Sequence, residues 1–354
     1  MEGVFKGRGA TLNPPARYAG RTGVAVDDGW YREAVPDSIA TEIRPEAARS
    51  IIARNESPDI PFSQSINPYR GCEHGCVYCY ARPSHAYVDL SPGIDFETRL
   101  FYKADAARLL RAELARPGYR CQPIMLGANT DPYQPVEKRL RVTREILEVL
   151  LQTRHPVTIV TKGTLVLRDL DLLVPLAAAG LARVTVSLTT LDPELKRTLE
   201  PRAASPQARL RVISTLAQAG IPVGVLAAPL IPAVNDAELE RIVEAAAAAG
   251  AGDAGYVLLR LPHEVKELFR DWLDVHLPLR AAHVMSLVRQ ARGGRDNDPR
   301  YGHRMRGGGP WAEMLAARFA LAARRAGLRA GRGPGLDTAQ FRPPRGSGQL
   351  DLGF

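Results

Sequence analysis

Residues 67–80 have the sequence NPYRGCEHGCVYCY, and the interpretation of the whole chain starts from this stretch. It contains three of the four cysteines, Cys72, Cys76 and Cys79, with the spacing C-x3-C-x2-C, directly after the first predicted strand of the core. Thiol groups so close together usually share a metal centre, because soft sulfur ligands select zinc, copper(I) or an iron–sulfur cluster. The stretch therefore predicts a metal site at the end of that strand.

Two kinds of metal centre are compatible with these cysteines. A tetrahedral zinc site needs four ligands, and the fourth would be His74 or Cys121. A [4Fe–4S] cluster normally takes four thiolates, so three thiolates leave one iron with an open position for a small molecule. A catalytic cluster requires such an open position.

Outward from this stretch, from about Phe62, short apolar runs of strand length alternate with longer amphipathic runs. The predicted strands are Gln64–Asn67, Pro123–Ala128, Val157–Thr161, Arg183–Leu188, Pro222–Ala227 and Gly255–Leu259. The predicted helices between them are Ala104–Ala115, Lys138–Thr153, Asp169–Ala179, Pro206–Ala219 and Asp236–Ala249. This alternation is typical of consecutive βαβ units, so it predicts an α/β fold with a parallel sheet.

The chain is predicted to have four parts. They are an N-terminal extension at 1–60 with a short helical pattern near Pro45–Arg54, the core at 61–288, a basic helical segment at 289–332 and a flexible tail at 333–354. Helices are also expected near His263–His276, Leu279–Arg292 and Trp311–Arg325. The tail is rich in glycine, proline and polar residues, which favours mobility.

The composition indicates a soluble globular protein in a reducing compartment. Of the 354 residues, 45% are hydrophobic and 24% are charged, which is the usual balance for such proteins. No apolar run approaches the length of a membrane-spanning helix, and the first thirty residues lack the apolar core of a secretory signal. Four cysteines are too few for a disulfide scaffold in a chain of this length. We therefore expect a cytoplasmic protein without a membrane partner.

The positive charge is concentrated near the C-terminus. Between Arg289 and Arg345 there are thirteen arginines, no lysine and four acidic residues, which accounts for the whole net charge of +9. Such a segment is typical of proteins that bind a polyanion, of which nucleic acid is the commonest. The alternative is a solvated arginine-rich surface with no partner, and charge alone does not separate the two.

The cysteine spacing, with the aromatic Tyr78 directly before the last cysteine, resembles the signature of the radical S-adenosylmethionine (SAM) superfamily. The resemblance implies that Cys72, Cys76 and Cys79 hold a [4Fe–4S] cluster whose fourth iron is chelated by SAM. A reductant such as flavodoxin or ferredoxin would then drive cleavage of SAM to methionine and a 5′-deoxyadenosyl radical, which abstracts hydrogen from a substrate. The implied fold is a partial (β/α)6 barrel, which agrees with the six strand–helix alternations.

Further runs resemble the spore photoproduct lyase-like group of that superfamily, in its bacterial branch without an assigned substrate. These are TDPYQPVE at 130–137, TKG at 161–163, Ser187 and APLIP at 228–232. All follow predicted strands, and in parallel α/β barrels ligands bind at that edge. The resemblance implies that Thr130, Lys162 and Ser187 contact the methionine part of SAM and that Tyr78 lies beside the adenine. Ordinary strand-end hydrogen bonds and a surface charge are the alternatives for these residues.

One difference from the lyase concerns the return of a hydrogen atom to the product. The lyase has a cysteine where this chain has Ala128, and the remaining Cys121 is expected at the other end of the strand, as a buried small hydrophobe. Photoproduct repair by the lyase's route is therefore not expected. Tyr80 and Tyr133 are the nearest candidate catalytic residues for hydrogen-atom relay, and packing against the cluster loop is the alternative for both.

Three functional hypotheses follow. The first is a radical SAM enzyme that acts on nucleic acid, in DNA repair or modification. The second is radical chemistry on a small molecule, and the third is a zinc-stabilised nucleic-acid-binding protein without catalysis. The last six residues, Gln349–Phe354, resemble the short motif by which bacterial repair proteins bind the sliding clamp, and an apolar plug folded onto the barrel is the alternative.

Overall fold

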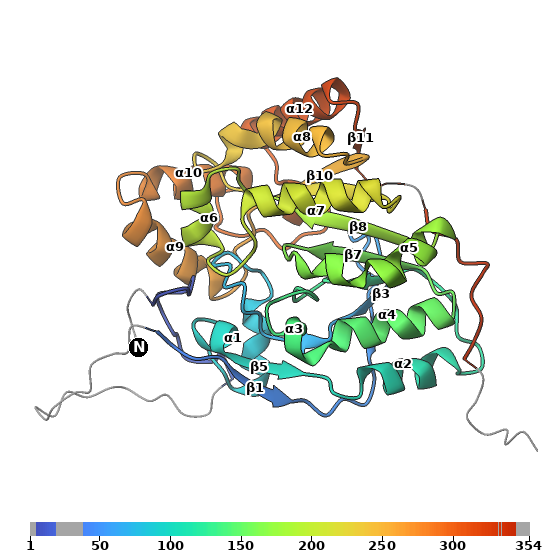
Figure 1. Cartoon of the computed structure of the whole chain (residues 1–354). Helices are drawn as coiled ribbons and strands as arrows, with labels where there is room; N and C mark the ends of the chain where they lie inside the picture. Colours follow the sequence, from blue (N-terminus) through green and yellow to red (C-terminus); the bar gives the residue numbers. More distant parts are fainter. Residues whose placement is uncertain (1–4, 19–37, 332, 334, 345–354) are drawn as a thin grey trace, which may run out of the picture.

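The computed structural model describes residues 5–18, 38–331, 333 and 335–344, and all six predicted core strands are present (Figure 1). They are β3 (Gln64–Ile66), β6 (Ile124–Leu126), β7 (Val157–Thr161), β8 (Ala182–Ser187), β9 (Val223–Leu230) and β10 (Asp253–Leu258). These strands are parallel and adjacent in chain order, so each βα unit lies next to the preceding one. The parallel sheet confirms the α/β fold that the alternation predicted.

Two edge strands extend the parallel sheet. The order is β11-β10-β9-β8-β7-β6-β3-β2, in which β2 (Ile52–Arg54) is antiparallel to β3 and β11 (Arg329–Ala330) is parallel to β10. Because the six core strands are parallel, their carboxyl ends form one edge of the sheet and their amino ends the opposite edge. We call these the carboxyl edge and the amino edge.

Helices cover one face of the sheet (Figure 1). The α-helices between core strands are α1 (Asp95–Thr98), α2 (Ala106–Leu114), α3 (Glu137–Leu140), α4 (Val142–Gln152), α5 (Leu170–Ala178), α6 (Pro193–Leu199), α7 (Pro206–Gln218) and α8 (Leu239–Ala248). The single helix predicted at 138–153 is divided into α3 and α4, because Arg141 has a left-handed φ of 57°. The start of α7 follows the sequence closely, since Ser205 accepts a hydrogen bond from the Ala208 amide and Pro206 occupies the first turn.

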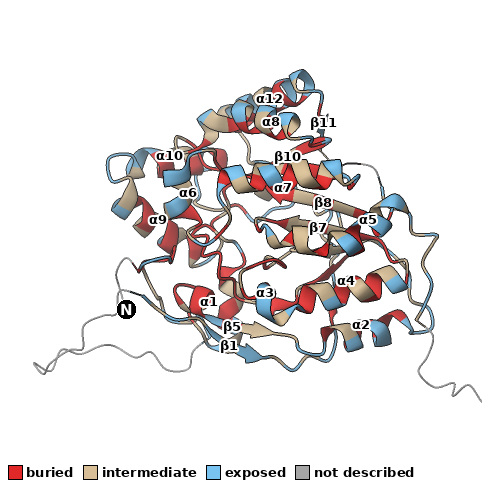
Figure 2. Cartoon of the chain, viewed as in Figure 1, coloured by how far each residue is buried: buried red, intermediate tan, exposed pale blue. Residues whose placement is uncertain are grey.

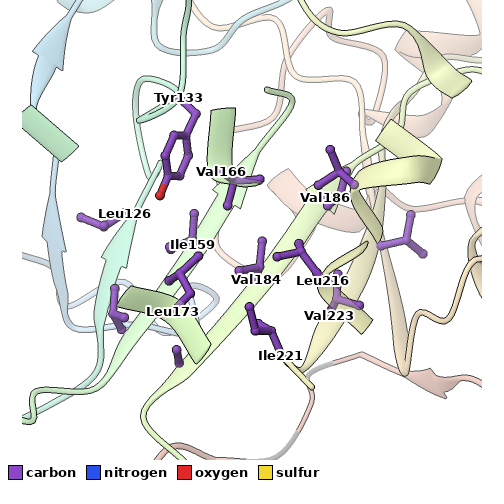
Figure 3. Packing of buried hydrophobic residues seen from close by; sticks show 14 of the residues in the cluster. Leu126, Tyr133, Ile159, Val166, Leu173, Val184, Val186, Leu216, Ile221 and Val223 are labelled. Atoms are coloured by element: carbon purple, nitrogen blue, oxygen red, sulfur yellow. The ribbon is translucent and has the colours of Figure 1, made fainter. Parts of the chain in front are cut away.

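The main core lies between these helices and the strands. Ile159 and Val184 alternate with partly buried neighbours along their strands, as a helix-covered face requires. In β9 the run Val223–Val225 is buried throughout. Figure 2 shows the sheet-facing sides of the helices as buried and their outer sides as exposed. Figure 3 shows Val166 and Leu173 packed against strand residues such as Ile159 and Val184.

The N-terminal part differs from the prediction near residues 45–54. That stretch holds the end of β1 (Glu42–Pro45) and β2, and no helix. β1 pairs with β5 (Arg99–Tyr102), and β5 pairs with β4 (Tyr69–Arg70), to form a second sheet of three strands. The helical pattern was misleading because its apolar residue Ile52 packs into the core through a strand pairing with Ile66, a contact that is not local in sequence.

The C-terminal part contains α9 (Val265–His276), α10 (Ala281–Ala291), α11 (His303–Arg306) and α12 (Pro310–Arg325), followed by β11. Beyond β11, Phe341 packs on Tyr119 and His155 at the amino edge, with ring centroids 5.4 and 5.3 Å away. Residues 345–354, with the proposed clamp motif Gln349–Phe354, lie outside the described residues. Among the helices that the structure describes, none is long and apolar enough to cross a membrane.

Candidate metal centre and cosubstrate site

The three clustered cysteines lie on one loop at the carboxyl edge. Cys72 and Cys76 are buried, whereas Cys79 is half-buried. Burial raises the pKa of Cys76 to about 12, with Glu200 adding to the shift. Burial likewise raises the pKa of Cys72 well above its usual range, with Asp131 and Cys76 contributing. The protein groups around these thiols therefore favour the neutral forms, and a bound cationic metal centre would be needed to make them thiolates.

The chemistry of this donor set fits a [4Fe–4S] cluster. A cubane binds each thiolate at a separate iron, so its ligands need not meet at one point. A zinc site requires ligands that converge on a single ion. Across the described part of the chain, no three His, Cys, Asp or Glu side chains converge in that way.

Of the two side chains suggested as a fourth zinc ligand, Cys121 lies far from the loop and His74 has another partner. Cys121 precedes β6, so it lies at the amino edge, opposite the cysteine loop. His74 is on the loop, but its Nδ1 lies 3.4 Å from the Asp131 carboxylate. Asp131 also accepts hydrogen bonds from the Thr161 hydroxyl at 2.7 Å and the Lys162 amide at 2.7 Å. Burial would raise the pKa of Asp131, but His74 and these hydrogen bonds hold it at about 2.

The cysteine loop is held from one side by a residue of the run at 130–137. Gln134 is fully buried, and its side-chain oxygen accepts a hydrogen bond from the Glu73 amide at 2.9 Å. Its side-chain nitrogen donates to the Gly71 carbonyl at 3.2 Å. These two hydrogen bonds fix the backbone on both sides of Cys72. They give Gln134, within the run at 130–137, a structural role.

A strap of N-terminal residues, 5–13, covers the other side of the loop. The Gly9 and Ala10 amides donate to the two carboxylate oxygens of Glu97, each at 2.9 Å. Glu97 is fully buried and also pairs with the buried guanidinium of Arg82. Gly9 passes so close to the loop that a Cβ there would lie 1.8 Å from the Gly75 carbonyl oxygen. Only glycine permits this approach.

A buried ionic network lies beside Tyr78. Its hydroxyl donates to Glu200, which also pairs with Arg209 and accepts a hydrogen bond from Thr189 at 2.6 Å. Burial would raise the pKa of Glu200, but Arg209 and Lys162 hold it at about 2, so it is a carboxylate at neutral pH. Burial, Cys76 and Glu200 together raise the pKa of Tyr78 well above its usual range. Tyr78 is therefore a fixed hydrogen-bond donor with its ring beside the cysteine loop.

The structure brings Lys162, Ser187 and Tyr78 together. The Lys162 ammonium donates to the Ser187 hydroxyl at 3.0 Å and lies 6.0 Å from the Tyr78 ring centroid. Ser187 is buried and also donates to the Ala228 carbonyl at 3.3 Å. Thr130 is buried nearby, and its hydroxyl donates to the Tyr69 carbonyl at 2.9 Å. The Thr130 hydroxyl thus makes an ordinary strand-end hydrogen bond, which was the alternative to a contact with SAM.

The two candidate relay tyrosines have different surroundings. Tyr80, the residue after Cys79, is 44% exposed at the carboxyl edge, and its hydroxyl donates to the Ala128 carbonyl. Tyr133 is 1% exposed, and its hydroxyl donates to Asp169 at 3.1 Å. Figure 3 shows the Tyr133 ring packed in the core. The structure thus places Tyr80 at the cysteine loop and the Tyr133 hydroxyl away from it.

Sequence reasoning missed Glu200, Arg209, Glu97 and Gln134, although all four are buried at the site. Glu200 and Arg209 are nine residues apart and lie in no recognised motif, so only the fold brings them to Tyr78. Gln134 lay within a quoted run, and a polar side chain between prolines was a usable signal. The cis peptide bond between Ala228 and Pro229 was also not anticipated.

The model of the family described as the Radical SAM superfamily matches residues 66–246, just over half of the chain. An uncharacterized protein of Mycobacterium tuberculosis is 41% identical over 226 residues, which cover 62% of this chain and 66% of that protein. An uncharacterized protein of Methanocaldococcus jannaschii is 29% identical over 173 residues, which cover 49% and 62%. The match thus spans less than two thirds of either relative.

Among solved structures, two of spore photoproduct lyase resemble this fold. One, complexed with dinucleoside spore photoproduct, has a TM-score of 0.57 at 15% identity over 81% of each chain. The other, a variant with bound AdoMet and dinucleoside spore photoproduct, has a TM-score of 0.57 at 15% identity over 81% of this chain and 80% of that one. At this identity the likeness concerns the fold.

Proposed function

Because the chain belongs to the radical SAM superfamily, we propose that it is an enzyme that cleaves SAM reductively and abstracts hydrogen from a nucleic-acid substrate. One observation carries the proposal: the Lys162 ammonium, the Ser187 hydroxyl and the Tyr78 ring meet beside the cysteine loop. These groups come from three separate segments, and we interpret their convergence as a shared ligand site.

Cys72, Cys76 and Cys79 would hold the [4Fe–4S] cluster. When bound, the cluster supplies the electron that cleaves SAM to methionine and a 5′-deoxyadenosyl radical. The protein's own contribution is binding and orientation. Lys162 provides a cation for the SAM carboxylate, Ser187 positions that ammonium, and Tyr78 offers an aromatic face to the adenine.

Glu200 and Arg209 keep this arrangement fixed. The Tyr78 hydroxyl donates a hydrogen bond to the Glu200 carboxylate, which holds the ring in one orientation. Arg209 also donates to the backbone carbonyl of Ser187 at 2.9 Å, so the same guanidinium braces the other side of the site. Tyr80, with its hydroxyl on the Ala128 carbonyl, remains our candidate for relaying a hydrogen atom to or from substrate.

The choice of nucleic acid as substrate rests on two observations. The spore photoproduct lyase structures of similar fold have bound dinucleoside spore photoproduct. In this chain, the carboxyl edge beyond β10 carries three arginines of the arginine-rich segment. Arg300 and Arg304 are paired with Asp298 and Asp59, whereas Arg306 is exposed and has no carboxylate partner among the described residues. Polyanionic substrates are drawn to such an edge. A small anionic substrate is the alternative, and the substrate screen below separates the two.

The proposal is tested with anaerobically purified protein. We expect about four irons per chain and broad absorbance near about 400 nm, with both lost in Cys76→Ala and kept in the control Cys121→Ala. Reduced protein with SAM should form 5′-deoxyadenosine. Stoichiometric zinc without iron, or no 5′-deoxyadenosine, would contradict the radical mechanism and favour the zinc protein.

The substrate class is tested separately. Reduced protein is incubated with SAM and deuterated DNA, RNA or small-molecule extract, and deuterium in 5′-deoxyadenosine identifies the fraction that donates hydrogen. Transfer from the small-molecule fraction alone would contradict the nucleic-acid assignment and leave the radical chemistry intact.

Two partners remain proposals. We expect a flavodoxin or ferredoxin to reduce the cluster, and Gln349–Phe354 to bind the sliding clamp. A fluorescent peptide covering 343–354 should bind purified clamp, and Gln349→Ala with Phe354→Ala should abolish binding. A peptide that does not bind would favour an apolar plug.

A further inference from the structure

A half-exposed aromatic ring and an arginine lie together beside the cysteine loop, outside the groups assigned to SAM. The Tyr80 ring carries the guanidinium of Arg260 on its face, with the Cζ atom 4.9 Å from the ring centroid. Arg260 follows β10 directly, so the pair joins the first and last core strands of the barrel at the carboxyl edge. Neither side chain has a part in the proposed SAM site.

Arg260 is unusual because it is half-buried without an acidic partner. Its only hydrogen bond to another described side chain runs from Nη1 to the Met305 sulfur, at 3.8 Å. No carboxylate in the described part of the chain lies within 4.0 Å of it. Burial and the nearby Arg304 lower the pKa of Arg260, although Tyr80 and the more distant Asp59 act in the opposite direction. A guanidinium held in this way has unused donors for an anion.

The neighbouring arginines do not share this property. Arg304 forms a two-point ion pair with Asp59, through Nε at 2.8 Å and Nη2 at 2.5 Å. Arg292 is buried and donates to backbone carbonyls, including those of Leu259 at 2.6 Å and His303 at 2.7 Å. Arg306 also has no carboxylate partner among the described residues, but it is exposed and lies over the Tyr256 ring, with Cζ 3.9 Å from the centroid. Within the described residues, Arg260 is therefore the half-buried cation of this cluster with neither a carboxylate nor a backbone partner.

A second exposed aromatic ring lies nearby. Tyr301 is 58% exposed, and the Arg304 guanidinium lies 4.8 Å from its ring centroid. Met305, the residue after Arg304, receives the contact from Arg260. Two exposed tyrosines interleaved with arginines form the combination that single-stranded nucleic acid uses, with bases on the rings and phosphates on the guanidinium groups.

We propose that Arg260 anchors a backbone phosphate of a single-stranded nucleic-acid substrate, with Tyr80 and Tyr301 as the surfaces on which its bases stack. This inference rests on the proposed function and adds the residues that recognise the substrate. A phosphate on Arg260 places the adjoining nucleotide beside Tyr80 and hence beside Cys79, the residue before Tyr80 on the loop. The same contact would bring a substrate atom close to the cluster loop.

The test is equilibrium binding of a fluorescent oligothymidylate of about ten nucleotides to the iron-loaded protein without reductant. Arg260→Ala should raise the Kd about tenfold and reduce the slope of log K against log salt by about 0.7, the value for one phosphate contact on a single strand. The Kd of Arg260→Lys should lie between those of wild type and Arg260→Ala, because lysine keeps the charge but cannot stack a planar guanidinium on the Tyr80 ring. Tyr301→Ala should weaken binding with no change of salt slope.

The matched control is Arg211→Ala. Arg211 is exposed on α7 and lacks an ion-pair partner within the described residues. Its replacement by Ala removes the same charge as Arg260→Ala. It should leave the Kd within about twofold. An oligothymidylate with an uncharged methylphosphonate backbone should bind wild type and Arg260→Ala equally.

The assignment would be overturned if Arg260→Ala bound the oligothymidylate as tightly as wild type. It would also be overturned if Arg260→Ala lost no more affinity than Arg211→Ala. An equal loss on the methylphosphonate probe would overturn it as well, because Arg260 would then act through folding alone. Formation of 5′-deoxyadenosine by wild type is measured alongside. Its absence would count against the proposed function, whereas the Arg260 result depends on binding alone.

Discussion

At the scale of single residues, the site divides into side chains that motifs could indicate and side chains that only the fold brings together. Lys162 directly follows a predicted apolar strand, so its place at the carboxyl edge followed from the alternation of strands and helices. Glu200 and Arg209 gave no such signal, because a Glu and an Arg between two strands usually lie on a solvated surface. Their burial depends on the Tyr78 hydroxyl and the Thr189 side chain, which arrive from other segments.

Glu200→Gln should destabilise the protein by about 3 kcal/mol or more, because the Arg209 guanidinium would remain buried without its counter-charge. The measurement is denaturant unfolding of the metal-free protein. The control is Glu194→Gln, which removes a carboxylate that is 72% exposed and should change stability by less than about 0.5 kcal/mol. Equal effects of the two substitutions would contradict the role given to Glu200.

The same carboxylate predicts a pH dependence. The pKa of Glu200 is held at about 2, below its ordinary 4.5, so its contribution to stability is complete above pH 4.5 and is lost as the pH falls toward about 2. Glu200→Gln should therefore unfold with a weaker dependence on pH across this window than wild type. Asp131 has a pKa shifted in the same direction, so some acid sensitivity should persist in the variant. Identical pH profiles would show that Glu200 is not a carboxylate in the folded protein.

Lys162→Ala should weaken SAM binding by about 1.5–3 kcal/mol, because a charge-assisted contact to the carboxylate is lost. Iron content should not change, since Lys162 contacts Ser187 and no cysteine within hydrogen-bond distance. Anaerobic calorimetric titration with SAM measures the effect. Lys138→Ala, which removes an exposed lysine of α3, is the control. Unchanged SAM affinity would remove Lys162 from the site.

At the scale of elements, strands covered by helices were easier to predict than segments that pack on a distant part of the chain. The strand prediction at Val157–Thr161 agrees with the structure to the residue, because an apolar run between a helix and a turn has one plausible role. The strand β1 was missed, since its partner β5 is not adjacent to it in sequence. The strand β2 was missed although its partner β3 is the next strand, because three residues are too few to show an alternating pattern. The strap at 5–13 was missed for the same reason: its partner Glu97 is more than eighty residues away.

The strap predicts a specific effect of one methyl group. In Gly9→Ala the new Cβ would clash with the Gly75 carbonyl oxygen, so the strap must move off the cysteine loop. Overpacking of this kind typically costs about 1–3 kcal/mol, and the exposed cluster should release iron to a chelator faster than in wild type. Gly335→Ala adds the same methyl group in open space and should release iron at the wild-type rate. Equal rates for both variants would mean that the strap does not protect the loop.

At the scale of the whole molecule, the arginine-rich segment spans both edges of the sheet. The start of α12 lies near the carboxyl end of β10, where Gly307 approaches Leu258. Its far end leads into β11, which pairs with Asp253 at the start of β10, so Arg324, Arg325 and Arg329 lie toward the amino edge. Composition located the excess charge correctly along the chain, but it could not show that the chain carries these arginines away from the cysteine loop.

This geometry predicts that the arginines near the amino edge contribute little to substrate binding. Replacing Arg324, Arg325 and Arg329 together by Ala removes three of the nine net positive charges, yet all three are exposed at the edge opposite the cysteine loop. The Kd for a short oligothymidylate should stay within about twofold of wild type, whereas Arg260→Ala should raise it about tenfold. The two variants are compared over a range of salt concentrations, with circular dichroism to confirm that α12 is intact. If the triple variant instead lost about 0.7 in salt slope for each arginine, the nucleic acid would have to extend across the sheet to the amino edge, and charge rather than position would govern recognition.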